Sequence, residues 1–297
     1  MADVTDRLGC DDRGQLLLIT ALALAVILLT VALLLNAAVY TENVATRETA
    51  ADSRDAIAFR GQAVDGVADL IRTENRGGGD PAAVADGINA TGPLVDRQQA
   101  RAGVIANVSF NGTTDGRRLT ADSLDTGNDW AVVEGVDEAR NVTLTAGSLP
   151  TDPTDVEADA LGVRFVTAGG NETRYVYEEG GAVVVDAANE THSPSRQCSI
   201  PESDPTTVDF TGDQLSAGSA TVDCYRGLWP EATVEDVRIV NGGTADGTFA
   251  ATVRGYDSVD AAVDTEAVVF AATIDLVYRT PEVDFETTVR VAPGEPR

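Results

Sequence analysis

The chain has 297 residues and carries 48 acidic against 21 basic side chains, a formal net charge of −27. Every basic residue is arginine, since the sequence contains no lysine. Such a surface repels the phosphate backbone, so the composition excludes nucleic acid as a partner. In molar salt the Debye length falls to about 3 Å and self-repulsion among the carboxylates is screened. The composition therefore predicts a salt-adapted protein of the kind found in haloarchaea.

The first predicted element is a hydrophobic helix. No charged residue occurs from Gly14 to Thr41. As a helix rising about 1.5 Å per residue, this segment would be roughly 40 Å long, more than the ~30 Å hydrocarbon core of a bilayer. A secretory h-region is shorter and ends at a small-residue cleavage site. The pattern predicts a transmembrane helix over residues 15–40, in contact with membrane lipid, after a short cytoplasmic leader over residues 1–14.

Cysteines and glycosylation sequons predict the side of the membrane on which each part lies. Cys10 stands alone before the apolar segment, whereas Cys198 and Cys224 lie far beyond it and form a candidate disulfide. Six Asn-x-Ser/Thr sequons mark candidate glycosylation sites on a secreted surface. We expect a single-pass protein of the cell membrane, with a cytoplasmic amino terminus and an extracellular carboxyl-terminal domain. The sequon asparagines are Asn89, Asn107, Asn111, Asn141, Asn171 and Asn189.

Beyond the apolar segment the sequence predicts more helix. Residues 41–76 contain no proline and are rich in alanine, glutamate and arginine, which indicates a helical stalk. The stretch "RGGGDPAA" then ends this helix and begins another, with Asp80 at the N-cap and Pro81 at the first helical position. Short helices are expected over Pro81–Asn89 and Pro93–Arg101.

After these helices the hydrophobic period changes to two. Short β-branched runs such as "LGVRFVTA", "TRYVYEE", "GAVVVDA", "VEDVRIV" and "AVVFAATIDLVY" predict nine or ten strands. Glycine- and asparagine-rich stretches, "FNGTTDGRR", "TAGGNETR" and "VNGGTADGT", predict hairpin turns. Ser193–Pro230 contains four prolines and is expected to be a long loop closed by the disulfide. The predicted fold class is α+β: a long N-terminal transmembrane and stalk helix, then a mainly antiparallel β-rich exterior domain over residues 77–297.

The sequence offers little for catalysis. Its one histidine, His192, lies in "NETHSPSRQC", where a solvated loop position is the simplest interpretation. There is no H-E-x-x-H, G-x-S-x-G, P-loop or EF-hand pattern. We therefore assign no catalytic, cofactor-binding or metal-ligating residue and expect a protein that is not an enzyme.

The amino-terminal segment resembles a known family. Arg13-Gly14 followed at once by a long apolar helix looks like a type IV pilin precursor, and "DRGQLLLITALALAVILL" with "LNAAVYTENVATR" resembles an uncharacterised haloarchaeal family of pilin-like surface proteins. The resemblance implies processing by a prepilin peptidase between Gly14 and Gln15. It also implies association with identical or related subunits through the N-terminal helix. Ile19 departs from the pattern, because many type IV pilins carry glutamate at that position.

Two functions of different classes follow from the sequence. In the first, the protein is a pilin-like, membrane-anchored structural subunit at the cell surface. In the second, it is a monomeric anchored surface or envelope protein that binds a ligand and does not form filaments. What the apolar helix packs against, protein or lipid, distinguishes the two.

Overall fold

The computed structural model describes residues 53–225 and 227–296. The predicted leader, the predicted transmembrane helix Gln15–Tyr40 and the first part of the predicted stalk lie outside these residues. Strands account for 51% of the structure and helices for 21%. The sheets are antiparallel, as each described strand pairing shows.

Two sequence predictions are corrected by this architecture. The fold class, α+β with a long N-terminal transmembrane and stalk helix, is wrong, because the structure is mostly antiparallel sheet accompanied by short helices. The single-pass membrane localisation, with its transmembrane and cell-surface assignments, is also corrected. Within residues 53–225 and 227–296, every helix is too short or too polar to cross a bilayer.

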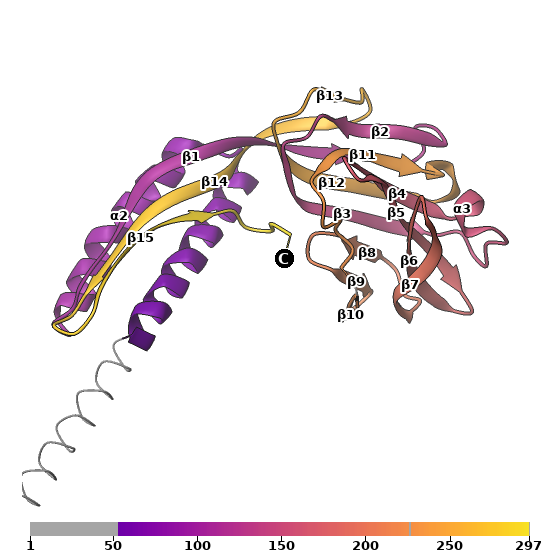
Figure 1. Cartoon of the computed structure of the whole chain (residues 1–297). Helices are drawn as coiled ribbons and strands as arrows, with labels where there is room; N and C mark the ends of the chain where they lie inside the picture. The colour runs from indigo at the N-terminus through magenta and orange to yellow at the C-terminus, as the bar shows by residue number, and fades with distance from the viewer. Residues whose placement is uncertain (1–52, 226, 297) are drawn as a thin grey trace, which may run out of the picture. The chain divides into compact units, whose positions relative to one another are not determined.

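One sheet has eight strands and the other has seven (Figure 1). The first runs in the order β10 (Ala220–Asp223), β9 (Gln214–Ala217), β8 (Thr206–Asp209), β3 (Glu138–Ser148), β12 (Asp246–Arg254), β1 (Ile105–Ala121), β14 (Asp264–Arg279) and β15 (Asp284–Val291). The second runs in the order β13 (Ser258–Val259), β2 (Asp129–Glu134), β11 (Val234–Val240), β4 (Leu161–Thr167), β5 (Gly170–Glu179), β6 (Ala182–Asn189) and β7 (His192–Pro201). A short helix, α3 (Val156–Asp159), precedes β4, and a 3-10 turn, η1 (Gly242–Thr244), precedes β12.

The main hydrophobic core contains residues from both sheets. Aromatic rings mark its centre: Phe165 on β4 lies edge-on to Phe210, which follows β8, with ring centroids 5.6 Å apart. The Trp229 ring also packs against Phe165, with ring centroids 5.1 Å apart. All three side chains belong to, or pack against, one cluster of buried residues. Burial of this apolar surface is the main favourable contribution to folding.

The helical part of the chain packs closely on the sheet. Helix α2 (Pro81–Ala100) begins as predicted, because the Asp80 side chain accepts a hydrogen bond from Ala82 N at 2.8 Å. The two short helices expected here are one helix, with Pro93 inside it. A Cβ on Gly92 would lie 2.5 Å from the carbonyl oxygen of Val108 on β1. Glycine at this position therefore lets the helix approach the backbone of β1 closely.

A helix over residues 53–76 precedes α2, and its end is fixed to β14. The buried Asn75 side chain donates to the carbonyl of Val269 at 2.9 Å and accepts from the amide of Val269 at 2.8 Å. The amide group thus pairs with strand backbone as a neighbouring strand would. Four residues later, a Cβ on Gly79 would lie 2.5 Å from the Cα of Val268, so only glycine fits there.

The described residues form two compact units. One contains residues 53–59 and Tyr278–Phe285, in which the rings of Phe59 and Tyr278 are 5.5 Å apart. The other contains Arg60–Val277 and Glu286–Arg297, and therefore holds both sheets' cores and all the site residues below. The predicted domain boundaries after residues 14 and 40 lie outside the described chain, and the boundary after residue 76 stays a prediction.

Candidate functional site

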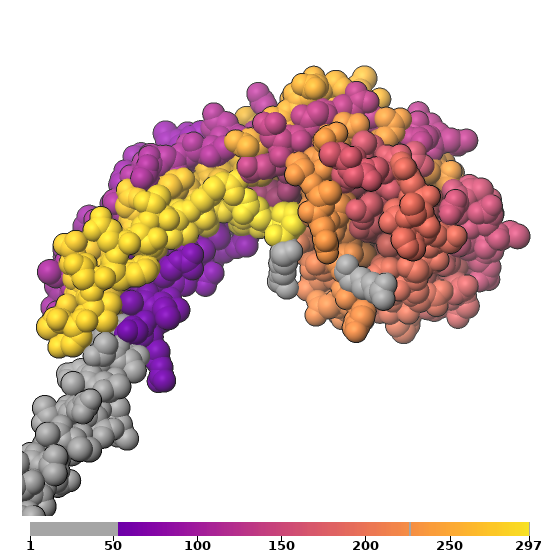
Figure 2. All heavy atoms as spheres, viewed as in Figure 1, coloured from indigo at the N-terminus to yellow at the C-terminus, as the bar shows by residue number. Residues whose placement is uncertain are grey.

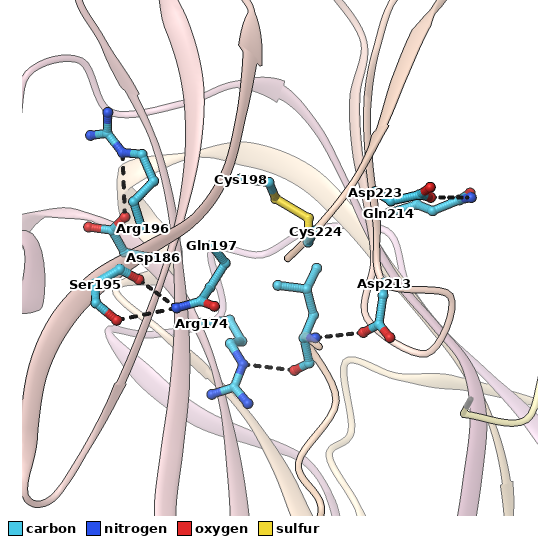
Figure 3. Close-up of a disulfide and its surroundings, with 11 residues drawn as sticks. Arg174, Asp186, Ser195, Arg196, Gln197, Cys198, Asp213, Gln214, Asp223 and Cys224 are labelled. Carbon is cyan, nitrogen blue, oxygen red and sulfur yellow. Dashed lines mark hydrogen bonds and ion pairs between the residues drawn. A yellow bond between two sulfur atoms is a disulfide. The ribbon is translucent and has the colours of Figure 1, made fainter. Parts of the chain in front are cut away.

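A disulfide connects the edges of the two sheets. Cys198 on β7 and Cys224, directly after β10, are joined with an S–S distance of 2.01 Å and a Cα–Cα distance of 4.9 Å (Figure 3). Strand β7 ends the seven-stranded sheet and β10 ends the eight-stranded sheet. The predicted cysteine pair is confirmed, and it closes the sandwich along one edge.

The surroundings of the disulfide differ from the expected loop. Ser193–Pro230 was expected to be irregular, yet it contains most of β7 together with β8, β9 and β10. Strands β8, β9 and β10 have only four residues each, and the proline and glycine residues in this segment resemble loop composition. Because β7 and β10 are edge strands, they tolerate residues that cannot complete a hydrogen-bond ladder on both sides.

A β-bulge in β7 turns Gln197 inward. Val185 on β6 pairs with Cys198 and Asp186 pairs with Arg196, which leaves Gln197 as the extra residue. Gln197 and Cys198 are consequently both buried although they are consecutive, at 8% exposure each. A bulge has this effect because it redirects one side chain out of the strict alternation of the strand.

Only the nitrogen of the Gln197 side-chain amide is hydrogen-bonded. Gln197 Nε2 donates to the carbonyl of Ser195 at 2.8 Å and to its hydroxyl at 3.2 Å. The Oε1 atom is buried and has no hydrogen-bond partner among the described residues. An unpaired buried acceptor costs about 1–3 kcal/mol relative to a paired one.

A buried arginine lies beside this glutamine. Arg174 on β5 is 4% exposed; its Nε donates to the carbonyl of Leu228 at 2.8 Å, and a terminal nitrogen pairs with Glu172 at 2.8 Å. The backbone amide of Leu228 donates to the carboxylate of Asp213 at 2.6 Å. Asp213 also accepts a backbone bond from Cys224 at 2.8 Å. Arg174 and Asp213 therefore fix the segment that follows the disulfide (Figure 3).

Glu172, Arg174 and Gln197 line a cavity of about 300 Å³ that is open to solvent. Its wall combines polar side chains with Ala187 and Ala188 on β6. The polar residues in the wall come from β5, the end of β6 and β7: Glu172, Arg174, Asn189, His192, Ser195 and Gln197. This is the candidate binding site, and we call it the disulfide-edge cavity.

His192 has a local structural role at the rim of the cavity. The side-chain oxygen of Asn189 accepts from the amides of Thr191 and His192 at 3.0 and 2.9 Å, which forms the β6–β7 turn. His192 Nδ1 lies 2.8 Å from the Thr191 hydroxyl. The histidine is exposed, at the first position of β7 and not in a loop as expected.

A second polar cluster lies next to the cavity on β5, β6 and β7. The Tyr177 hydroxyl donates to Asp186 at 2.9 Å, and Arg196 pairs with Glu179 while its Nε lies 3.9 Å from Asp186. Asp186 is only 7% exposed. Burial raises the pKa of the Asp186 carboxyl, and the hydrogen bond from Tyr177 opposes that shift. Burial also raises the pKa of Tyr177, with the Asp186 bond acting in the same direction.

The sequence-predicted processing and glycosylation residues are distributed along the chain. Arg13, Gly14 and Gln15 lie outside the described residues. Asn89 is exposed on α2, Asn107 and Asn111 are exposed on β1, and Asn141 is exposed on β3. Asn171 is half-buried on β5, and Asn189 is exposed at the end of β6. The use of these sequons stays a prediction.

Several of the sequon side chains are held by other residues. Asn111 Nδ2 donates to both carboxylate oxygens of Asp275, at 3.0 and 2.9 Å, and Thr288 donates to the same carboxylate at 2.6 Å. These bonds, from Thr288 first and then Asn111, lower the pKa of Asp275. The polar set lies on β1, β14 and β15, and Figure 2 shows the C-terminal strands, in yellow, uncovered in this view.

Sequence reasoning missed Arg174 and Gln197. Arg174 belongs to a run predicted as a strand, "TRYVYEE", but an arginine in such a run normally faces solvent. Gln197 required knowledge of the bulge, which nothing in "RQCSI" indicates. No cluster of three or more His, Cys, Asp or Glu side chains able to hold a metal ion is found in the part of the chain that the structure describes.

Comparison with known proteins gives one likeness. No curated protein matches the chain. The sequence profile of a family of unknown function, DUF7261, matches residues 10–134, which end at the last residue of β2. The match thus covers the helix over residues 53–76, α2 and the first two strands, and the disulfide-edge cavity lies outside it.

Proposed function

We propose that the protein is a structural subunit similar to type IV pilins, adapted to high salt, that associates with identical or related subunits. The observation that carries the proposal is the pairing of Asn75 with both backbone groups of Val269 at 2.9 and 2.8 Å. The helix ending at residue 76 is thereby fixed to an antiparallel sheet, as the resemblance implies for a pilin-like subunit. A subunit that transmits force needs such a joint, because a loosely attached helix would separate from its sheet.

The contacts around that joint are buried and specific. Val269 is fully buried, and its carbonyl also accepts from Arg140 Nη2 at 3.0 Å. Gly79 lies against Val268 with no room for a side chain. A polar pair buried between a helix and a strand fixes their relative position, because any shift leaves backbone groups unpaired.

The proposal includes processing of the amino terminus. Cleavage between Gly14 and Gln15 would remove Asp11, Asp12 and Arg13, and the first residues of the new chain would then carry no charged side chain. An apolar terminus packs against a neighbouring subunit without burying unpaired charge. Glycine before the cut leaves the peptide bond accessible.

Mass spectrometry of the amino-terminal peptide from the native host tests the processing step. The proposal predicts a peptide that begins at Gln15, either free or cyclised to pyroglutamate. It also predicts that Gly14→Leu blocks cleavage, whereas the matched change Gly9→Leu within the leader does not. Recovery of only Met1- or Ala2-initiated protein from the wild type would contradict the pilin-like assignment.

The cavity favours a second candidate function. A monomeric binding protein that does not assemble would use the disulfide-edge cavity, which has a volume of about 300 Å³ and is open to solvent. The two functions differ in oligomeric state, so sedimentation of the native protein separates them.

A further inference from the structure

We propose that Asn189, alone among the six sequon asparagines, is an acceptor for N-glycosylation, in which a sugar is transferred from a glycosyl phosphate donor to its side-chain nitrogen. The sequon Asn189-Glu190-Thr191 covers the last residue of β6 and the turn before β7. Asn189 pairs with His192, so Glu190 and Thr191 are the two residues of this turn. All four are exposed. An enzyme that acts on the folded chain can therefore reach both the amide and the hydroxyl of this sequon.

The other five sequons lie in a helix or in strands. Asn89 is inside α2, where side chains two residues apart do not face each other, and the Thr91 hydroxyl donates to the carbonyl of Gly87 at 2.8 Å. Along a strand, residues two positions apart are separated by about 6–7 Å, so the sequon hydroxyl does not reach the asparagine amide. This separation applies to three asparagines: Asn107 and Asn111 on β1 and Asn171 on β5.

Three of these asparagines also have their side-chain nitrogen occupied. Asn111 Nδ2 is bonded to a carboxylate, as described above. Asn141 Nδ2 donates to the carbonyl of Pro293 at 3.2 Å. Asn171 Nδ2 donates to Glu190 Oε1 at 3.2 Å. A transferase would have to break these hydrogen bonds before the nitrogen could react.

The amide of Asn189 is arranged in the opposite way. Its oxygen accepts from the Thr191 amide and the Thr191 hydroxyl, both at 3.0 Å, and from the His192 amide at 2.9 Å. Two of these donors are backbone N–H groups, which identifies the acceptor as Oδ1 and leaves Nδ2 without a hydrogen-bond partner among the described residues. Donors aimed at an oxygen stabilise negative charge that develops there. They therefore favour loss of a proton from Nδ2, which makes this nitrogen a nucleophile.

The transfer needs no residue of this chain beyond the sequon. Nδ2 of Asn189 gives one proton to a base of the transferase and attacks the anomeric carbon of the glycosyl phosphate. The N–C bond forms as the C–O bond to the phosphate breaks, and the phosphate oxygen leaves with that electron pair. Nothing is oxidised or reduced. The same bond forms whether the phosphate of the donor is carried by a lipid or by a nucleotide.

Peptide mapping of the full chain purified from its native host tests the proposal. Cleavage after arginine places Asn189 on the peptide Tyr175–Arg196 and Asn171 on the separate peptide Phe165–Arg174. We expect a glycan mass on Tyr175–Arg196, located at Asn189 by electron-transfer fragmentation, and no added mass at the other five sequons. A Tyr175–Arg196 peptide without added mass, or equal occupancy at another sequon, would overturn the proposal. Inhibiting the synthesis of lipid-phosphate sugar carriers distinguishes the donors, because a lipid-linked donor then gives no added mass and a nucleotide-linked donor still does.

Three hydroxyl variants test the part played by the turn. Thr191→Val removes the hydroxyl that is bonded to Asn189 Oδ1, and Thr191→Ser keeps it. Thr143→Val removes the hydroxyl of the Asn141 sequon and is the matched control. We expect the added mass at Asn189 to be lost in Thr191→Val and kept in the other two variants. Wild-type occupancy in Thr191→Val would overturn the proposal.

The result stays decisive if one variant or the proposed function fails. If Thr191→Val does not fold in molar salt, the wild-type peptide map and Thr191→Ser decide the question. Cleavage after Gly14 and assembly are measured on the amino-terminal peptide and by sedimentation, so neither changes the reading at Asn189. Loss of the added mass in Thr191→Ser, or its loss in the control Thr143→Val, would overturn the assignment.

Discussion

The guanidinium of Arg140 lies over the ring of Phe270, with the Arg140 Cζ 4.9 Å from the ring centroid. Arg140 is 1% exposed and donates to the carbonyls of Val269, at 3.0 Å, and Pro293. Burial lowers its pKa to about 10, with Glu295 opposing the shift. The side chain is therefore still charged at neutral pH. Backbone carbonyls and an aromatic face stabilise this charge in place of a directly bonded carboxylate.

Arg140→Lys tests this arrangement. An ammonium group cannot reach two carbonyls and the Phe270 ring with the geometry of a planar guanidinium. We expect the free energy of unfolding to fall by about 1.5–3 kcal/mol, the cost of one lost hydrogen bond to a charged group. Exposed Arg117→Lys is the matched control. Chemical denaturation measures both, and equal stability of the two variants would show that Arg140 is replaceable.

The strand predictions succeeded where β-branched residues are concentrated in short runs. "LGVRFVTA", "GAVVVDA" and "VEDVRIV" overlap β4, β6 and β11, because such runs between turn residues indicate strands. "FNGTTDGRR" was expected to be a turn, yet it lies inside β1 (Ile105–Ala121). Gly116 fits there because β1 pairs with β12 over Arg117–Ala121 and a Cβ on Gly116 would lie 2.8 Å from the carbonyl oxygen of Val253. Close approach of two backbones is a tertiary property that local sequence does not reveal.

Of the candidate site, only the disulfide could be predicted from the sequence. The pairing of Cys198 with Cys224 followed from counting cysteines. The cavity beside it depends on a one-residue bulge at Gln197 and on Arg174 turning inward toward Leu228. Both depend on which strands become neighbours, and neither leaves a periodic signal in the sequence.

Removing the disulfide should destabilise the protein and loosen the cavity. The bond closes a loop with a sequence separation of 26, which corresponds to about 3 kcal/mol of stabilisation in the chain-entropy model. We expect the Cys198→Ala/Cys224→Ala variant to lose stability by that amount in chemical denaturation. The single variant Cys10→Ala provides the control. A double variant as stable as this control would contradict a structural role for the bond.

The Asp186 carboxyl predicts a pH-dependent difference between two variants. Because burial raises its pKa in the folded state, the unfolded chain ionises at lower pH. The contribution of the neutral Asp186 carboxyl to the free energy of unfolding is fully present below the pKa of the unfolded chain, about 3.9. It is lost as the pH rises through the raised pKa of the folded state. Asparagine does not ionise, so the stability of Asp186→Asn relative to the wild type should increase as the pH rises from about 3 to neutral.

Exposed Asp96→Asn is the control for that comparison, since it removes one surface carboxylate without changing the buried cluster. Thermal melts across the pH range measure both differences. If the two variants differ from the wild type by the same amount at every pH, Asp186 does not couple to folding.

Low salt should destabilise the full chain. The formal net charge is −27, and the carboxylates repel one another once the Debye length grows from about 3 Å at 1 M to about 10 Å at 0.1 M. We expect a lower Tm at 0.1 M than in molar salt, fully restored when salt is added back. Scanning calorimetry measures the shift, and a melting temperature independent of salt would contradict the salt-adapted assignment.

The most direct test of the proposed function is the mass of the native protein in solution. Sedimentation velocity in molar salt, with electron microscopy of the sedimented fraction, measures whether the chain assembles after it is purified from its native host. The proposal predicts large particles with a regular subunit repeat, which a chain with Gly14→Leu fails to form. A single species at the 30.9 kDa mass of one chain, at every protein concentration, would contradict a structural subunit and leave the monomeric binding protein.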